Sequence, residues 1–218
     1  MKKSILCGIL VCLSVVAFAQ QKMDWYAYWG SNETGSQIDP QRMVADKDGN
    51  IYVAALYGGD KVKVGDQTLA SNSATDKGDA VIIKVSPSGS VLWTYSVAAA
   101  GSATVSDIAI DAYGNIFVTG AFSNAINVGT KQMPVDDTNM GEAALYVLKL
   151  RADGSAVRAW QISALGAKAG GIAIDSENNV IIAGLLDGDA TLTWGGEVAG
   201  DFQNSAQLIV AKYTNKDD

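Results

Sequence analysis

The sequence predicts an all-β protein, a β-propeller-like array of three four-stranded antiparallel blades. The first observation is an internal repeat: Asp46, Asp111 and Asp175 each follow an apolar run and recur at steps of 65 and 64 residues. The second is that each copy contains short runs rich in β-branched and aromatic residues. The third is that turns containing Gly or Asn separate these runs, which is typical of strands joined by tight connections.

Each copy begins with an apolar strand that ends at the anchor Asp, and a second strand follows a tight turn. We expect a positive φ at one position of this turn, which is occupied by Gly49, Gly114 and Asn178. Asn tolerates the left-handed region better than other non-glycine residues, so its use in the third copy supports the turn. The first turn, Asp46–Asn50, also looks like the start of a calcium loop. The other copies do not keep its acidic positions, so a hairpin turn is favoured and no metal is expected.

A third and a fourth strand complete each copy. The third is an apolar run that ends near a lysine, at residues 80–85, 145–150 and 208–213. The fourth carries a tryptophan, Trp93 in the first copy and Trp160 in the second, on the side that alternation predicts to be inward. We therefore expect these tryptophans to be structural core anchors rather than sugar-stacking platforms.

The third copy ends before its fourth strand, and a strand of that kind precedes the first copy. The repeats span about 39–103, 104–167 and 168–218, and the extra strand is expected at 23–29 with Trp25 as its anchor. In ring-shaped propellers an N-terminal strand of this kind completes the last sheet and removes an exposed edge. Residues 20–218 are therefore predicted to form one circularly permuted repeat domain.

The first 19 residues predict export. A basic start, Met1–Lys3, precedes an apolar run that ends in Ala17-Phe18-Ala19, the order of a cleavable signal peptide. The run is short for a membrane span, so we expect a mature protein in the periplasm or at the cell surface. The mature chain has neither His nor Cys, which excludes the common triads and His-ligated zinc, and no cofactor is expected.

The motif Asp111–Gly120 and the segments after it resemble the secreted β-propeller repeat family often called SBBP repeats. The resemblance covers nearly all of the mature chain and implies a propeller fold, but it implies little about function. Known propellers have roughly four to eight blades. With three, the chain is expected to form a six-bladed ring as a homodimer; an open arc or a fragment of a longer protein are the alternatives.

Charge and residue type narrow the function. The formal net charge of −7 disfavours binding to nucleic acid. Tyr26 and Tyr28 occupy outward positions of the extra strand, and Trp194 stands where the other copies have Val, so these three are the candidate ligand or partner surface, for a glycan or a protein. We expect a binding or scaffolding module without catalytic residues. The alternative is a propeller enzyme, a lyase or hydrolase that uses loop carboxylates and a divalent metal on a polysaccharide or lactone.

Overall fold

The computed structural model describes most of the repeat region as antiparallel β-structure. The residues described are 23–32, 34–59, 61–71, 78–97, 99, 101–128, 131–134, 144–162, 168–186, 190–194, 197–202 and 206–215. The predicted signal peptide, residues 1–19, lies outside them. Within these ranges the elements are strands, and no helix there has the length and apolar character needed to cross a membrane.

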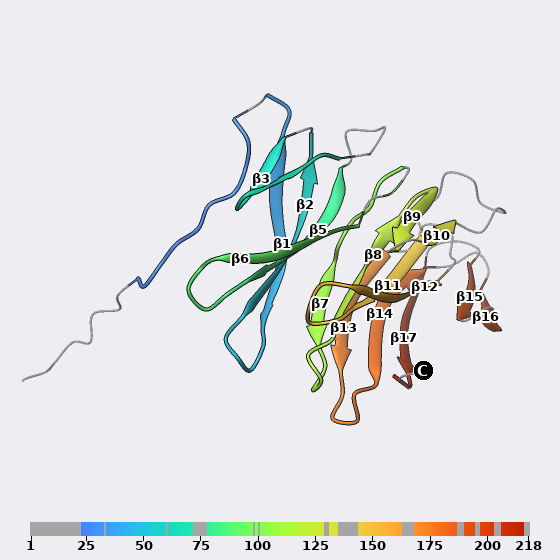
Figure 1. Ribbon diagram of the computed structural model, residues 1–218. Coiled ribbons are helices and arrows are strands. Elements are labelled where there is room, and N and C mark those ends of the chain that lie inside the picture. The colour runs from blue at the N-terminus through green and yellow to red at the C-terminus, as the bar shows by residue number, and fades with distance from the viewer. Residues whose placement is uncertain are drawn as a thin grey trace, which may run out of the picture.

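Three sheets follow one another along the chain, each containing the strands predicted for one copy (Figure 1). The first has the order β1-β2-β5-β6, with β1 Gln37–Ala45, β2 Ile51–Gly58, β5 Asp79–Val85 and β6 Val91–Val97. The second has the order β7-β8-β11-β12, with β7 Asp107–Ile110, β8 Ile116–Phe122, β11 Ala144–Leu150 and β12 Ala156–Ile162. The third has the order β13-β14-β17, with β13 Lys168–Ile174, β14 Val180–Leu186 and β17 Gln207–Tyr213. The all-β class and the antiparallel pairing are confirmed.

A short hairpin is inserted between the second and third strands of every sheet, a feature that the sequence analysis missed. The three hairpins are β3 Val62–Val64 with β4 Gln67–Leu69, β9 Ala125–Val128 with β10 Lys131–Pro134, and β15 Ala190–Trp194 with β16 Glu197–Phe202. The first turns at Gly65, which has a φ of 59°. Strands of three to six residues are too short to show a reliable period, so the sequence pattern did not reveal this insertion.

The turn between the first two strands is the same in all three sheets. Gly49, Gly114 and Asn178 have φ values of 80°, 84° and 62°, as predicted. The anchor Asp accepts hydrogen bonds from two backbone N–H groups of the turn and from the side chain of the following Asn; for Asp111 these distances are 2.8–2.9 Å. The carboxylate is therefore used to fix a hairpin turn.

The three sheets pack face to face through two apolar layers. One layer joins the first and second sheets and contains Tyr52, Ile82, Val118 and Tyr146. The other joins the second and third sheets through side chains that include Val147 and Ile182. A third cluster covers the remaining face of the first sheet, where the β3–β4 hairpin lies. Both faces of β5 and β11 are buried, which explains their continuous apolar sequence.

The strand expected at 23–29 does not form in the single chain. This segment has no strand structure, and its first backbone bridge, Gly30 with Lys63, is to the hairpin of the first sheet. The sheet that it was expected to complete lies beyond the second sheet, which separates the first from the third (Figure 1). The described residues thus form a row of three sheets, and β17 is the edge strand of the last.

Candidate functional site

The N-terminal segment packs on the first sheet in the way that the fourth strand of the first sheet packs on the second. The Trp93 indole N–H donates to the carbonyl of Ala152 at 3.1 Å, and the Trp25 indole N–H donates to the carbonyl of Pro87 at 2.9 Å. Pro87 and Ala152 occupy the same position, 65 residues apart. Trp25 therefore holds the place of a fourth-strand tryptophan from a preceding unit.

Trp25 also differs from Trp93 in its burial. The expectation that Trp25 is a core anchor is wrong for the single chain, because it is 36% exposed. Trp93 is half-buried and makes an edge contact with Tyr52, with ring centroids 5.9 Å apart. The difference follows from their surroundings, since Trp93 belongs to a complete sheet and Trp25 to a segment with no sheet of its own.

Trp160 occupies a different register from Trp93. Trp93 lies opposite Lys84, whereas Trp160 lies opposite Val147, two residues before the equivalent lysine. The alignment of the two tryptophans is therefore shifted by two residues. A shift of two keeps a side chain on the same face of a strand, and Trp160 packs against the layer between the second and third sheets.

Side chains of the N-terminal segment alternate between the first sheet and solvent. Trp29 packs against the apolar cluster on the outer face of the first sheet. Tyr26 and Tyr28 point away and are 77% and 86% exposed. The outward positions predicted for these two tyrosines are confirmed.

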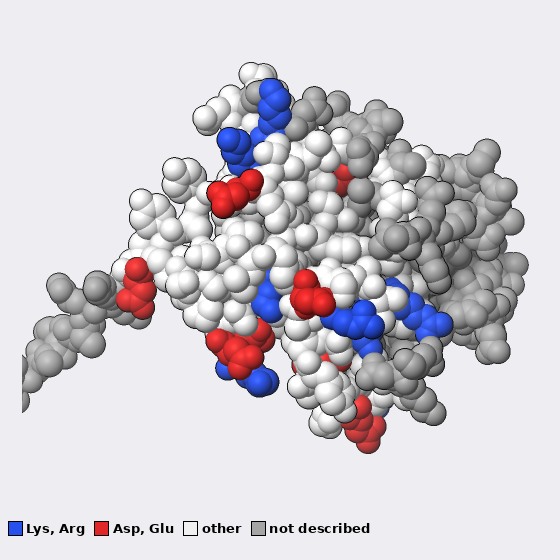
Figure 2. Space-filling view, viewed as in Figure 1, with Lys and Arg blue, Asp and Glu red and all other residues white. Residues whose placement is uncertain are grey.

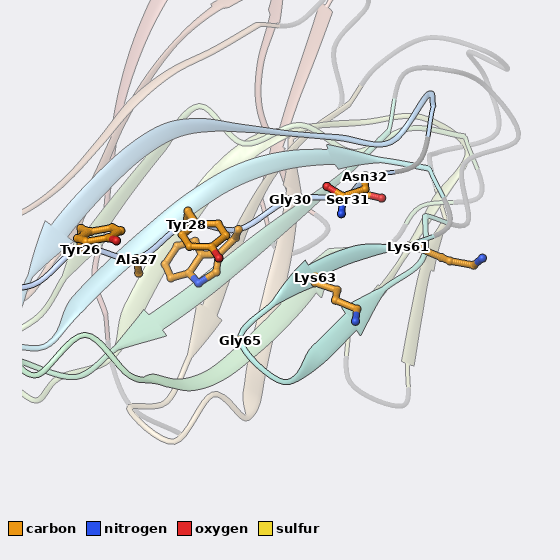
Figure 3. Close-up of a pocket in the computed structure, with 10 residues that line it drawn as sticks. Tyr26, Ala27, Tyr28, Gly30, Ser31, Asn32, Lys61, Lys63 and Gly65 are labelled. Atoms are coloured by element: carbon orange, nitrogen blue, oxygen red, sulfur yellow. The ribbon is translucent and has the colours of Figure 1, made fainter.

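The two tyrosines line a groove between the N-terminal segment and the β3–β4 hairpin. The groove has a volume of about 930 Å³. Figure 3 shows the tyrosines on one side and Lys61 and Lys63 on the hairpin across from them. Aromatic faces beside ammonium groups can hold an acidic sugar ring, and an extended segment such as 23–29 can accept a neighbouring strand.

The other end of the array exposes an apolar sheet face. Leu208 and Val210 of β17 are 79% and 69% exposed. Their equivalents in β11, Leu145 and Val147, are 2% and 0% exposed, because the third sheet covers them. In the part of the chain that the structure describes, the third sheet thus repeats the face of the second without a layer that covers it. The sequence analysis did not predict this exposed face, although it aligned residues 208–213 with the equivalent runs 80–85 and 145–150.

The lysine near the end of the third strand contacts the next sheet in the first two units. Lys84 donates to the Ala152 carbonyl of the next sheet at 2.9 Å, and Lys149 reaches Asn215 at the equivalent position of the third sheet at 3.0 Å. Lys212 forms an ion pair at 2.6 Å with Asp175 of its own sheet. The hydrogen bond from Lys212, together with that from Asn179, holds the pKa of Asp175 well below its usual range.

The described residues provide little for metal chemistry. They contain no group of three acidic, His or Cys side chains arranged to hold an ion. The enzyme alternative would use loop acids, and five of these, Asp60, Asp136, Asp137, Asp187 and Asp189, lie outside the described residues. On the face shown in Figure 2, acidic and basic side chains are interspersed rather than gathered by sign. Trp194 lies in β15 opposite Glu197, and its side chain is outside the described part of the structure.

Comparisons with known proteins give no functional information. No protein-family model matches the chain, and no curated protein matches it. It is similar to the crystal structure of a protein of unknown function from Bacteroides caccae, with a TM-score of 0.38 and 12% sequence identity. The match covers 78% of this chain and 47% of that protein, so the chain spans less than half of its length. The resemblance to SBBP repeats stays a prediction.

Proposed function

We propose that the chain is an exported bacterial repeat protein that acts as a binding and scaffolding module and binds protein partners by extending its row of sheets. The observation that carries this proposal is the exposure of Leu208 and Val210 at positions that are buried in the second sheet. Exposed apolar side chains on an edge strand provide a surface suited to protein association. Export rests on the signal peptide predicted at residues 1–19.

The groove beside Tyr26 and Tyr28 belongs to the same proposal. A glycan ligand would use the aromatic rings and the lysines, but the segment also makes an antiparallel bridge at Gly30, with both the N–H and the carbonyl bonded to Lys63 at 3.0 and 2.8 Å. A backbone already paired in this manner favours an added strand over a sugar. The face-to-face stacking of successive sheets in chain order also supports a propeller-like arrangement.

The enzyme alternative has no supporting observation in the described part of the chain. The anchor carboxylates Asp46, Asp111 and Asp175 all accept hydrogen bonds from their own turns, so their oxygens hold backbone rather than substrate. We therefore propose a binding function alone.

The test is the size of the protein in the cells that make it. A cell extract prepared without denaturant is separated by native electrophoresis and probed for the wild-type chain and for the double variant Leu208→Lys with Val210→Lys. We expect the wild type to migrate in an assembly larger than one chain and the variant to migrate as a single chain, because two ammonium groups on the face prevent its burial.

Tyr113→Lys is the matched control. Tyr113 is exposed like the two apolar residues, but it lies in the turn between β7 and β8, away from both ends of the array. The control should migrate with the wild type. Migration of the wild type as a single chain, or an assembly that survives the double substitution, would contradict the proposed function.

A further inference from the structure

The two ends of the array are complementary to one another. Among the described residues, the third sheet has no fourth strand beside β17 and no layer over Leu208 and Val210. At the other end, residues 23–29 have the side-chain alternation and the tryptophan contact of a fourth strand but belong to no sheet. Each end therefore provides what the other lacks.

The carbonyl of Pro87 in the first sheet also indicates that the two ends are complementary. In the second sheet the carbonyl of Ala152 accepts from both Trp93 and Lys84, two residues of the preceding unit. In the first sheet the equivalent carbonyl of Pro87 accepts from Trp25, the tryptophan of that pair. The lysine of the pair would come from the third strand of a preceding unit, and the residue with that place in the repeat is Lys212.

The chain does not join its own two ends. The second sheet lies between the first and the third, with an apolar layer on each of its faces, so Trp25 and Lys212 of one chain are on opposite sides of it. The described residues of one chain therefore do not bring the two complementary ends together.

We infer that the partner is a second copy of this chain, bound head to tail. Residues 23–29 of one molecule form the fourth strand beside β17 of the other molecule. The first sheet of the molecule that provides residues 23–29 covers Leu208 and Val210 of the other. Two copies that do this for each other close a ring of six sheets, within the usual size of propellers. This inference rests on the proposed function and names the partner of the same surface.

The exposure of the two tyrosines follows from this arrangement. Tyr26 and Tyr28 occupy the positions of Thr94 and Ser96 in the first sheet, and the Thr94 hydroxyl donates to Gln67 of the inserted hairpin. In the head-to-tail dimer the equivalent hairpin is β15–β16 of the partner molecule, so the tyrosines would lie under that hairpin. The groove of the single chain is then part of the interface.

Complementation between two variants of the mature chain tests the inference. We call residues 23–29 with the first sheet the head, and the third sheet the tail. The tail variant carries Leu208→Lys and Val210→Lys. The head variant carries Ala27→Pro and Tyr28→Pro. Only one of two successive amides in a strand faces a given neighbour, so two adjacent prolines are needed to remove it with certainty. Light scattering coupled to size exclusion measures the mass of each variant and of an equimolar mixture.

We expect the wild type at twice the chain mass, and each variant alone as a monomer with dimer affinity lowered at least about tenfold. The mixture should recover a dimer, because the intact head of one variant meets the intact tail of the other. Circular dichroism confirms that each variant is folded. Dimerisation of the head variant alone, or a mixture that stays monomeric although the wild type is dimeric, would overturn the head-to-tail arrangement.

The same data separate the two proposals. A purified wild type that stays monomeric, together with a large assembly in the cell extract that the Lys substitutions abolish, would overturn the second copy and leave the proposed function in place. A single chain in both experiments would overturn both.

Discussion

The indole of Trp93 lies directly over Gly154, the glycine of the turn that joins the third and fourth strands of the next sheet. A Cβ atom added to Gly154 would lie 2.8 Å from Cδ2 of the indole. Trp25 has the same relation to Gly89, again at 2.8 Å. The contact is thus a repeating joint between successive units, and the N-terminal segment makes it without a sheet of its own.

Substitution of Gly154 by Ala tests this joint against a matched glycine. Gly154 and Gly114 have φ values of 87° and 84°, so Ala is strained at both positions. At Gly114 the nearest atom to an added Cβ is 3.8 Å away, whereas at Gly154 an added Cβ would overlap with the Trp93 indole. We expect Gly154→Ala to lower the free energy of unfolding by about 1–3 kcal/mol more than Gly114→Ala, measured by urea unfolding. Equal losses would mean that the indole moves aside at no cost.

Truncation of the two tryptophans should have unequal effects. Trp93→Ala removes a half-buried ring that packs on Tyr52 and should cost about 3 kcal/mol in the free energy of unfolding. Trp25→Ala removes a ring that is 36% exposed in the single chain and should cost about 1 kcal/mol there. Both values are to be measured at a dilution where the single chain predominates. A larger loss for Trp25 than for Trp93 would show that the N-terminal segment has a tighter environment than described.

Asn178 combines a left-handed backbone with a contact between sheets. Its φ is 62°, and its side-chain oxygen accepts a hydrogen bond from the Ala112 N–H of the second sheet at 2.9 Å. Asn178→Gly keeps the backbone conformation and loses the hydrogen bond, so we expect a loss of about 1 kcal/mol or less. Asn178→Ala loses the bond and strains the backbone, and should cost about 2–3 kcal/mol. A higher midpoint of thermal unfolding for Asn178→Ala than for Asn178→Gly would contradict the backbone strain expected at this position.

Stability should depend on pH through the Lys212–Asp175 ion pair. The folded pKa of Asp175 is lowered from its usual 3.8, mainly by the hydrogen bond from Lys212. The unfolded chain therefore takes up the proton at a higher pH than the folded chain does, so this contribution is complete above about pH 4 and is lost as pH falls through the folded pKa.

Lys212→Met, which removes the ammonium group and keeps most of the stem, tests this linkage. Unfolding by urea between pH 2 and pH 6 should show the wild type more stable than the variant at pH 6, with the difference shrinking as the pH falls, because protonation of Asp175 ends the ion pair. A difference that stays constant over this range would assign the effect of Lys212 to packing instead.

The sequence predicted the repeating elements well because their signals are local. The anchor Asp, the positive φ at Gly49 and Asn178, and the apolar third strands each depend on residues within a few positions of one another. The described residues have no fourth strand beside β17, in agreement with the same alignment. The strands that these features predict are found in the three main sheets.

The features that sequence analysis missed depend on contacts between distant residues. The strands of the inserted hairpins are too short to show a period. Trp160 lies two residues further along its strand than Trp93 does, although both sheets have the same bulge after the lysine. The exposure of Val210 could not be predicted either, because its sequence resembles the buried run of β11 and its burial depends on whether another sheet follows. Tyr26 and Tyr28 were identified because their outward position follows from alternation alone.

Hydrogen exchange of residues 20–218 over a range of concentrations tests the proposed pairing of residues 23–29 with β17, because it follows both strands at once. We predict that amides in residues 23–29 and in β17 become protected together as concentration rises, while those of β11, already buried on both faces, do not change. Residues 23–29 that exchange at the unprotected rate at every concentration, in a sample that light scattering shows to be dimeric, would contradict the pairing of this segment with β17.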